Sequence, residues 1–412
     1  MKKTAGHILL TALLLTAYLA CKKPFNPQLA SVATNFLAVD GPIISGDTTF
    51  ITLSRTTSLS DTTQNKAELK AIISVENDQG MLYTLTEKGK GQYFLPVTNF
   101  DIARQYRLDI KTTDGKIYQS DFVPMKVTGP IDTIYYQTNG YLNVQFFLNA
   151  HDPTNNTRYY RWDYQEVWQY NSWYEAFYDY TNGQIVNIND ANFLNNTSYY
   201  CYRHDYSNQI FVGSSANLSQ DVITKQLLSS VPDTSQKISE IYALVVHQYA
   251  LTEDGFKYYQ NLKANTENLG SIFDPQPSTT MGNIHCITSP TDVVIGFVSV
   301  STVSQKVASF RYSQLGVLNL GSTAPLNPVN DFYYGAPPGG QCGSTELLFA
   351  PASTYNARVQ QALSSGNYLV YDQDIILPGP GWVGYLYAPK ACVDCSYAGG
   401  TKTRPSYFPP PY

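Results

Sequence analysis

The fold class of this chain is decided by residues 106–118, which read YRLDIKTTDGKIY. Every second residue from Tyr106 to Ile110 is apolar, and charged residues occupy the positions between them. This period of two predicts a strand that buries one face. The pair Asp114-Gly115 then predicts a tight hairpin turn, for which we expect positive φ at both residues.

Short apolar segments of the same kind recur around this hairpin, and turn residues such as those at 77–80 separate them. The predicted strands are 36–39, 50–53, 69–75, 82–85, 92–95, 106–110 and 117–122. Strands at this spacing are typical of a sandwich. We therefore expect residues 35–127 to form an immunoglobulin-like or transthyretin-like β-sandwich.

The pattern is interrupted near Pro130, which keeps the preceding glycine out of helical geometry and so favours a domain boundary. Residues 128–412 are expected to form a larger β-rich C-terminal domain with a few short helices and a cysteine-containing tail. Its first strands are predicted at 134–136 and 142–148, and helices at 219–228 and 252–269. The expected fold class is thus mainly β.

The first twenty residues have the pattern of a signal peptide. Lys2 and Lys3 precede an apolar run from Ile8 to Ala20 that is broken only by two threonines. A helix of this length spans about 20 Å, which is less than the roughly 30 Å hydrocarbon core of a bilayer. We therefore expect residues 1–20 to be removed.

The end of this leader predicts a lipid anchor. A small residue, Ala20, precedes Cys21 as in a bacterial lipobox, although Tyr18 stands where leucine is usual. Cleavage would leave Cys21 acylated, and two or three acyl chains would make membrane attachment lasting. Residues 21–34 would then be a lipidated tether. The alternative is an ordinary secretory cleavage that leaves Cys21 as a plain residue.

Composition narrows the class of protein further. The chain has 27 Lys and Arg against 32 Asp and Glu, a net charge of −5, which gives no basic footprint for nucleic acid. Tyrosine is abundant, with 34 residues, and suits half-buried strand surfaces without adding charge. This composition is typical of an extracytoplasmic β protein.

Five cysteines remain after Cys21, and we expect structural disulfides among them. Spacing alone cannot choose the pairing, and a link from Cys342 to Cys392 or Cys395 is favoured. The Cys392-Val393-Asp394-Cys395 motif lacks the further ligands of a zinc site and the context of a redox motif. The candidates are Cys201, Cys286, Cys342, Cys392 and Cys395.

The stretch from Tyr159 to Tyr180 is unusually aromatic. Its even-numbered aromatics share one face of a strand, and such a face could stack on a ligand such as a glycan or a peptide. The alternative is that the same face is core, with tyrosine hydroxyls at its rim. The candidate residues are Tyr160, Trp162, Tyr164, Trp168 and Tyr170.

The sequence contains no catalytic motif, such as a nucleophile elbow, a His-Glu-x-x-His zinc motif, a phosphate loop or a dinucleotide fingerprint. Asp372 and Asp374 are too few for a calcium site, and residues 335–343 are expected to be a loop. The histidines after the leader are scattered, at His151, His204, His247 and His285. We therefore expect no enzyme activity, no metal and no cofactor.

Several segments resemble domain of unknown function 4249 (DUF4249), a family of Bacteroidota lipoproteins. The resemblance covers nearly the whole chain after the leader. The similar segments are 36–41 (FLAVDG), 51–55 (ITLSR), 91–93 (GQY), 106–110 (YRLDI), 114–118 (DGKIY), 248–249, 265–274, 282–284, 392–395 (CVDC) and 399–401.

The resemblance implies an outer-membrane lipoprotein, often encoded near TonB-dependent transporters, with no established reaction. We expect a binding or accessory protein beside such a transporter in nutrient uptake. The alternatives are a structural or adhesive surface protein and, with least support, an extracellular hydrolase. Lys22 and Lys23 stand where surface lipoproteins of this phylum usually carry acidic residues, so the cell-surface and periplasmic faces both stay open.

Overall fold

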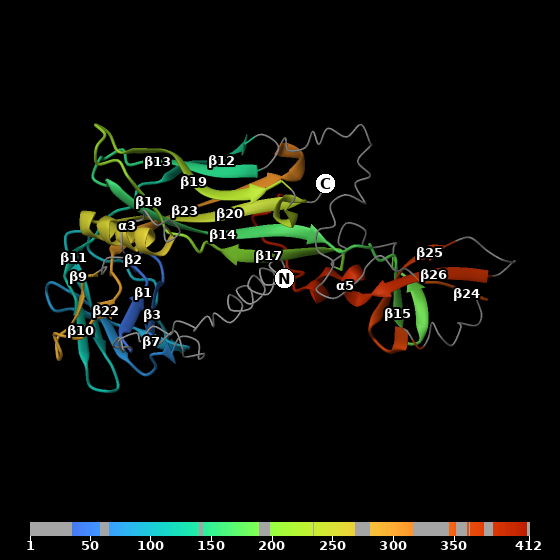
Figure 1. Cartoon of the computed structure of the whole chain (residues 1–412), viewed down its shortest axis with the longest axis horizontal. Coiled ribbons are helices and arrows are strands. Elements are labelled where there is room, and N and C mark those ends of the chain that lie inside the picture. The colour runs from blue at the N-terminus through green and yellow to red at the C-terminus, as the bar shows by residue number, and fades with distance from the viewer. Residues whose placement is uncertain are drawn as a thin grey trace, which may run out of the picture.

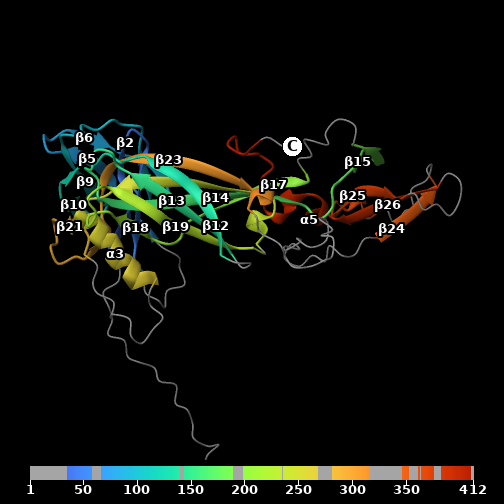
Figure 2. The same cartoon turned by 90° about the horizontal axis from the view of Figure 1, so that it is seen from above.

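The computed structural model describes residues 35–57, 66–139, 143–188, 198–233, 235–267, 281–315, 346–351, 361, 363–374 and 382–409. Three parts follow one another along the long axis of the molecule: an N-terminal sandwich, a central pair of sheets and a distal part (Figure 1, Figure 2). The predicted fold class, mainly β with a sandwich first and a larger β-rich region behind it, is confirmed.

All seven predicted strands of the sandwich are present. They are β1 (Leu37–Asp40), β3 (Thr49–Arg55), β5 (Ile72–Asn77), β6 (Leu82–Thr84), β8 (Gln92–Leu95), β9 (Gln105–Lys111) and β10 (Ile117–Ser120). The apolar pattern did not reveal four further strands in this part of the chain, of two to four residues each, and the first of them joins a sheet of the central part. These are β2 (Ile43–Ser45), β4 (Lys66–Ala67), β7 (Thr86–Gly89) and β11 (Val123–Pro124).

Two strands from much later in the chain complete the sandwich. β21 (Ile284–Cys286) pairs with β10, and β22 (Val294–Ile295) pairs with β1 in parallel. One sheet has the order β22-β1-β3-β8-β7 and the other β21-β10-β9-β5-β6, with the core between them. The N-terminal segment alone therefore does not make up the sandwich.

The hairpin that decides the fold class forms, but its turn differs from the expected one. Tyr106, Leu108 and Ile110 are buried in the core as the alternation predicts. Only Gly115 has a positive φ, +85°, whereas both central residues were expected to have one. Its N–H donates to the Thr112 carbonyl at 3.0 Å, so the loop is longer than two residues and closes on a single left-handed glycine.

The central part packs two sheets face to face around the largest cluster of buried aromatic side chains among the described residues. One sheet consists of β12 (Ile131–Asn139), β13 (Asn143–His151) and β19 (Val222–Pro232). The other has the order β17 (Tyr200–Tyr206), β14 (Tyr159–Asn171), β20 (Ile241–Ala250), β23 (Val300–Arg311) and β2, with β18 (Phe211–Ser214) beside β14. The short helices η2 (Gln236–Ile238) and η3 (Tyr312–Gln314) lie at the ends of strands.

The helix predicted at 219–228 is wrong, because most of this segment belongs to β19. β19 pairs with β13 through a register that shifts twice, and Lys225 has a φ of +55°. Bulges of this kind break the period of two in a strand. The apolar residues of β19 were therefore spaced as they would be in a helix.

The other predicted helix is confirmed as α3 (Glu253–Glu267). Glu253 and Asp254 lie in its first turn, where acids favour the helix dipole. Its buried side chains Tyr258 and Tyr259 pack against Phe297 and cover the start of the central sheets. The predicted end of this helix, at residue 269, lies outside the described residues.

The segment between the sandwich and the central part is fixed by side chains on both sides. Thr128 N–H donates to Thr302 Oγ1 at 2.8 Å. Gln248, which is fully buried, donates from Nε2 to the Gly129 carbonyl at 2.8 Å and accepts from Trp162 Nε1 at 2.7 Å. These bonds fix the chain at residues 128 and 129, next to Pro130, where the sequence predicts the domain boundary.

The distal part combines an excursion between β14 and β17 with the C-terminal region. Its elements are β15 (Tyr178–Thr181), β16 (Gln184–Asn187), β24 (Glu346–Pro351), β25 (Tyr368–Asp374), β26 (Trp382–Pro389), α5 (Lys390–Val393) and η4 (Cys395–Ala398). The first two form a hairpin, and the next three form a sheet of order β24-β26-β25. None of the helices that the structure describes is long and apolar enough to cross a membrane.

Candidate functional site

The aromatic row of β14 lies in the core of the central part. Tyr160, Trp162, Trp168 and Tyr170 are each at most 8% exposed, and Tyr164 is half-buried against the same cluster. A ligand could stack on them only if the two sheets separated. The burial therefore supports the core alternative, and β14 does not offer the ligand platform that the sequence suggested.

The row is interrupted by one acid that sequence reasoning missed, Glu166, which is 6% exposed. Its Oε1 accepts from Ser229 Oγ at 2.9 Å and from Tyr242 Oη at 2.7 Å, and its Oε2 accepts from Lys237 Nζ. Burial raises the pKa of neighbouring Tyr164 to about 12, with Glu166 adding to the effect. The sequence signal was an even-numbered charged residue within an otherwise aromatic strand face.

A second polar cluster lies on the opposite face of β14. Asp163 Oδ1 lies 3.0 Å from His247 Nδ1, and Asp163 Oδ2 lies 3.4 Å from Arg161 Nη2. The Arg161 guanidinium also lies over the rings of Tyr249 and Tyr259, at 4.7 and 5.2 Å. Burial raises the pKa of Tyr249, and the nearby Asp163 raises it further. The arrangement neutralises charge between the sheet and α3.

The four histidines lie on four different strands, β13, β17, β20 and β21. Three of them pair with an aspartate, and the ring of His204 packs against Tyr206. The pairs are His151 with Asp132 at 2.7 Å, His247 with Asp163 at 3.0 Å and His285 with Asp121 at 3.2 Å. Among the described side chains, the three histidines in these pairs therefore act as hydrogen-bonding groups.

His285 and Cys286 do not form a base and nucleophile pair. They are adjacent on β21 and so point to opposite faces of the sheet. Cys286 is a buried free thiol in the sandwich core, whereas His285 is mostly exposed. Asp372 and Asp374 lie on β25, and residues 335–343 and Cys21 lie outside the described residues.

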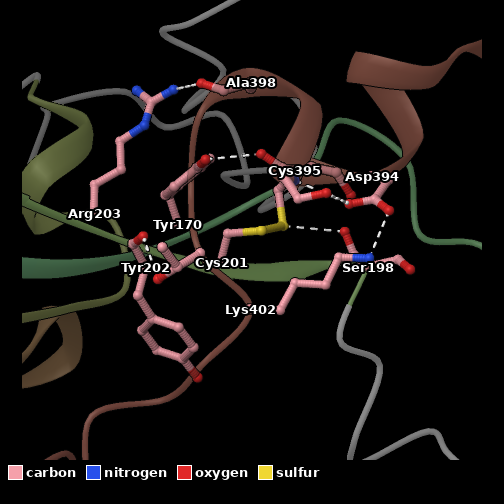
Figure 3. The surroundings of a disulfide bond; sticks show 12 residues. Tyr170, Ser198, Cys201, Tyr202, Arg203, Asp394, Cys395, Ala398 and Lys402 are labelled. Atoms are coloured by element: carbon pink, nitrogen blue, oxygen red, sulfur yellow. Dashed lines mark hydrogen bonds and ion pairs between the residues drawn. A yellow bond between two sulfur atoms is a disulfide. The ribbon is translucent and has the colours of Figure 1, made fainter.

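A disulfide joins Cys201 on β17 to Cys395 on η4 (Figure 3). Of the two links that the sequence favours for Cys342, the one to Cys395 is therefore excluded. Cys392 is disulfide-bonded as well, but Cys342, its predicted partner, lies outside the described residues. Among the described residues, one group could offer three ligand atoms to a metal ion, namely Cys201, Asp394 and Cys395. Its two sulfur atoms are, however, bonded to each other in the disulfide.

The chain around the bridge is fastened by further bonds, which Figure 3 shows. Cys395 N–H donates to the Ser198 carbonyl at 2.9 Å, and Tyr170 Oη donates to the Cys395 carbonyl at 2.9 Å. Arg203 donates to the Ala398 carbonyl from the other side. The tail after η4 then pairs with β17 through Tyr202 and Thr401. The C-terminal tail thus covers the edge strand of the central sheet.

Comparison with known proteins gives a family but no reaction. Residues 22–307 match the family described as Domain of unknown function (DUF4249), and the resemblance at 392–401 lies beyond this match. No curated protein matches the chain.

Two solved structures are distantly similar. A two fibronectin type-III domain segment from chicken tenascin is 11% identical, covering 53% of this chain and 90% of that chain, with a TM-score of 0.16. The Yersinia pseudotuberculosis adhesin InvE is 14% identical, covering 53% of this chain and 55% of that chain, with a TM-score of 0.15. Both scores are too low to support an argument. Because the family match spans more than half of its length, the chain belongs to the family described as Domain of unknown function (DUF4249).

Proposed function

We propose that this protein is a lipid-anchored outer-membrane component that binds beside a TonB-dependent barrel transporter in nutrient uptake and catalyses no reaction. The observation that carries the proposal is the fastening of the distal part. The Cys201–Cys395 bridge and the tail bonds hold this part against β17. A part that is fixed in this way can present a surface to a partner without paying to order it on binding.

The position of the predicted anchor supports the same proposal. Cys21 precedes Asn35, the first described residue, by fourteen positions. An extended chain spans at most about 3.5 Å per residue, so the anchor could lie up to about 50 Å from the sandwich. A tether of this reach would let the molecule lie along the membrane, so that the distal part, at the other end of the molecule from the sandwich, could reach a barrel in the same membrane (Figure 1).

Exposed aromatic side chains are present on the tail side of the molecule and not on the predicted β14 row. Tyr206 on β17 is 65% exposed, Tyr397 on η4 is 56% exposed and Tyr407 in the tail is 37% exposed. Exposed tyrosines are enriched where proteins contact partners, because the ring buries area and the hydroxyl bonds at the rim. We call Tyr206, Tyr397 and Tyr407 the tail tyrosines and propose them as partner or ligand contacts.

The proposal is tested by affinity purification of a tagged full-length copy from detergent-solubilised native envelopes, followed by mass spectrometry. We expect a barrel transporter at a stoichiometric level. A Cys21→Ala copy, which would lack the anchor, should recover much less of it. Recovery of the lipoprotein alone in both preparations would contradict the proposal and favour a structural or adhesive role.

A further inference from the structure

The buried carboxyl group of Glu166 is held at its two oxygen atoms by two different kinds of donor. Its Oε1 accepts from the hydroxyls of Ser229 at 2.9 Å and Tyr242 at 2.7 Å. Its Oε2 accepts from the amine of Lys237. The hydroxyls belong to β19 and β20, which lie in different sheets, and the lysine belongs to η2 between them. The folded central part therefore fixes both sides of one carboxyl group.

This arrangement places a nucleophile against a carbonyl carbon. Because Nζ of Lys237 contacts Oε2 of Glu166, the Cδ atom of the acid lies next to it across that oxygen. The Glu166 side chain is 8% exposed and that of Lys237 is 29% exposed, so bulk water is largely excluded from the pair. Reacting groups held in such contact have effective concentrations of about 10⁵ M or more. Amide formation, which is slow between free molecules, is favoured by this geometry.

The surroundings also favour the protonation states that react. A buried ion pair costs free energy of desolvation, and the shift of one proton from the Lys237 amine to Glu166 leaves two uncharged groups. The ring of Trp168, a residue that is 8% exposed, lies with its centre 5.0 Å from Nζ and covers one side of the pair. The neutral amine and the carboxylic acid are the forms from which an amide can be made.

Two further groups that amide formation requires are in place. Attack on Cδ puts negative charge on Oε1, where the hydroxyls of Ser229 and Tyr242 already donate, and donors at a developing oxyanion lower the barrier. The second acid is Asp205, whose Oδ2 lies 3.6 Å from Nζ of Lys237. This carboxylate can take a proton from the attacking nitrogen and pass it to the departing oxygen.

We propose that Lys237 and Glu166 join in an isopeptide bond once the chain has folded. Nζ of the neutral lysine attacks Cδ of the protonated acid, and Asp205 accepts a proton from the nitrogen. Oε2 receives that proton beside the one it carries and leaves as water. One amine and one carboxylic acid thus give one amide and one water, with no oxidant or cofactor.

The reaction takes place once in each molecule, so it is a modification and not the turnover of a substrate. The loop that the bond closes, from 166 to 237, contains the β15-β16 hairpin and Cys201, which is linked to Cys395. The isopeptide bond is therefore a second covalent fastening at the base of the distal part, and unlike the disulfide it resists reductants. The inference does not rest on association with a transporter, and either proposal can fail alone.

The test is a tryptic digest of the full-length protein from its native envelope, reduced, alkylated and analysed by mass spectrometry. Trypsin does not cut after a lysine whose amine is acylated. We expect peptides 162–203 and 226–257 to be joined, with a mass below their sum by that of one water molecule. Fragmentation should place the link between Glu166 and Lys237.

The digest contains its own matched control. Lys257 pairs with Glu253 at 2.6 Å, but both side chains are more than half exposed to water. This pair should stay unlinked, so trypsin should cut after Lys257. The variant Lys237→Met keeps the apolar stem without the nucleophile and should give peptide 162–203 alone. Asp205→Asn, at an exposed position, should leave most molecules unlinked.

Recovery of 162–203, 226–237 and 238–257 as separate peptides from the folded wild type would overturn the inference, whatever the variants do. Loss of water between Lys257 and Glu253 to the same extent would also overturn it, because the reaction would then not depend on the buried site. A link that forms equally in Asp205→Asn would overturn the role assigned to that acid.

Discussion

Cys201 and Cys395 form a disulfide although they lie 194 positions apart in the chain. The bridge joins the edge strand of the central sheet to the short helix that follows the distal part. It therefore closes a loop that contains most of the central and distal parts. The stability of the far end should depend on this bond more than on any single packing contact near it.

Replacing both cysteines of this bridge by serine should lower the free energy of unfolding by about 2–4 kcal/mol, because the unfolded chain regains the entropy of an open loop. Guanidinium denaturation at constant protein concentration measures the change. Cys286→Ala is the matched control, since it removes a buried free thiol and leaves the bridges intact. Equal losses in the control and in the double variant would contradict the assigned role of the bridge.

The buried amide of Gln248 should contribute strongly to the stability of the connection between the sandwich and the central part. Gln248→Leu leaves the Trp162 N–H and the Gly129 carbonyl without partners, which should cost about 2–3 kcal/mol. Gln305→Ala, at an exposed position of β23, should change stability by less than about 0.5 kcal/mol. If urea denaturation finds the two variants equally stable, the hydrogen bonds of Gln248 do not stabilise this connection.

Glu240 gives a pH-dependent prediction. Burial raises the pKa of this carboxyl above its ordinary value of 4.5. The folded chain therefore keeps this proton to a higher pH than the unfolded chain does. The free-energy cost of burying the ionised carboxylate is absent below about pH 4.5 and grows as pH rises through the folded pKa. Glu240→Gln should therefore raise the unfolding midpoint in urea at pH 7 and leave it unchanged at pH 4. A gain of equal size at both pH values would contradict this assignment.

The lipid anchor predicted at Cys21 can be tested by labelling cells with radioactive palmitate. Wild-type protein should carry the label and enter the detergent phase on Triton X-114 partition, because its acyl chains bury many methylenes. Cys21→Ala should lose the label and remain in the aqueous phase, while Cys286→Ala should behave as wild type. Label retained in Cys21→Ala would exclude the anchor from this residue.

The sandwich could be predicted from the sequence because each strand signals itself locally. Residues 106–110 alternate strictly, and the buried side chains Tyr106, Leu108 and Ile110 follow that alternation. β21 and β22 could not be placed in the sandwich, because their short segments join it only through pairing with strands more than 150 positions earlier. β19 was misread because its bulges shift the apolar residues out of a two-residue period.

The site was harder to predict, because burial depends on which sheet covers a strand face. The parity of the β14 aromatics was visible in the sequence, but the sheet of β12, β13 and β19 that covers them was not. For the same reason Glu166 could not be recognised as buried, and its contact with Lys237 depends on a turn 71 positions away. The pairing of Cys201 with Cys395 likewise required the folded tail.

The central functional claim is that the tail tyrosines, at the end fastened by the disulfide, contact a barrel transporter. The most direct test places a photo-crosslinking amino acid at Tyr206 or Tyr397 in the native envelope. Leu82 on the sandwich, which is 61% exposed, serves as the matched position. The account predicts a crosslink to a barrel protein from Tyr206 or Tyr397 and none from Leu82. A crosslink from Leu82 alone, or none from any position, would contradict it.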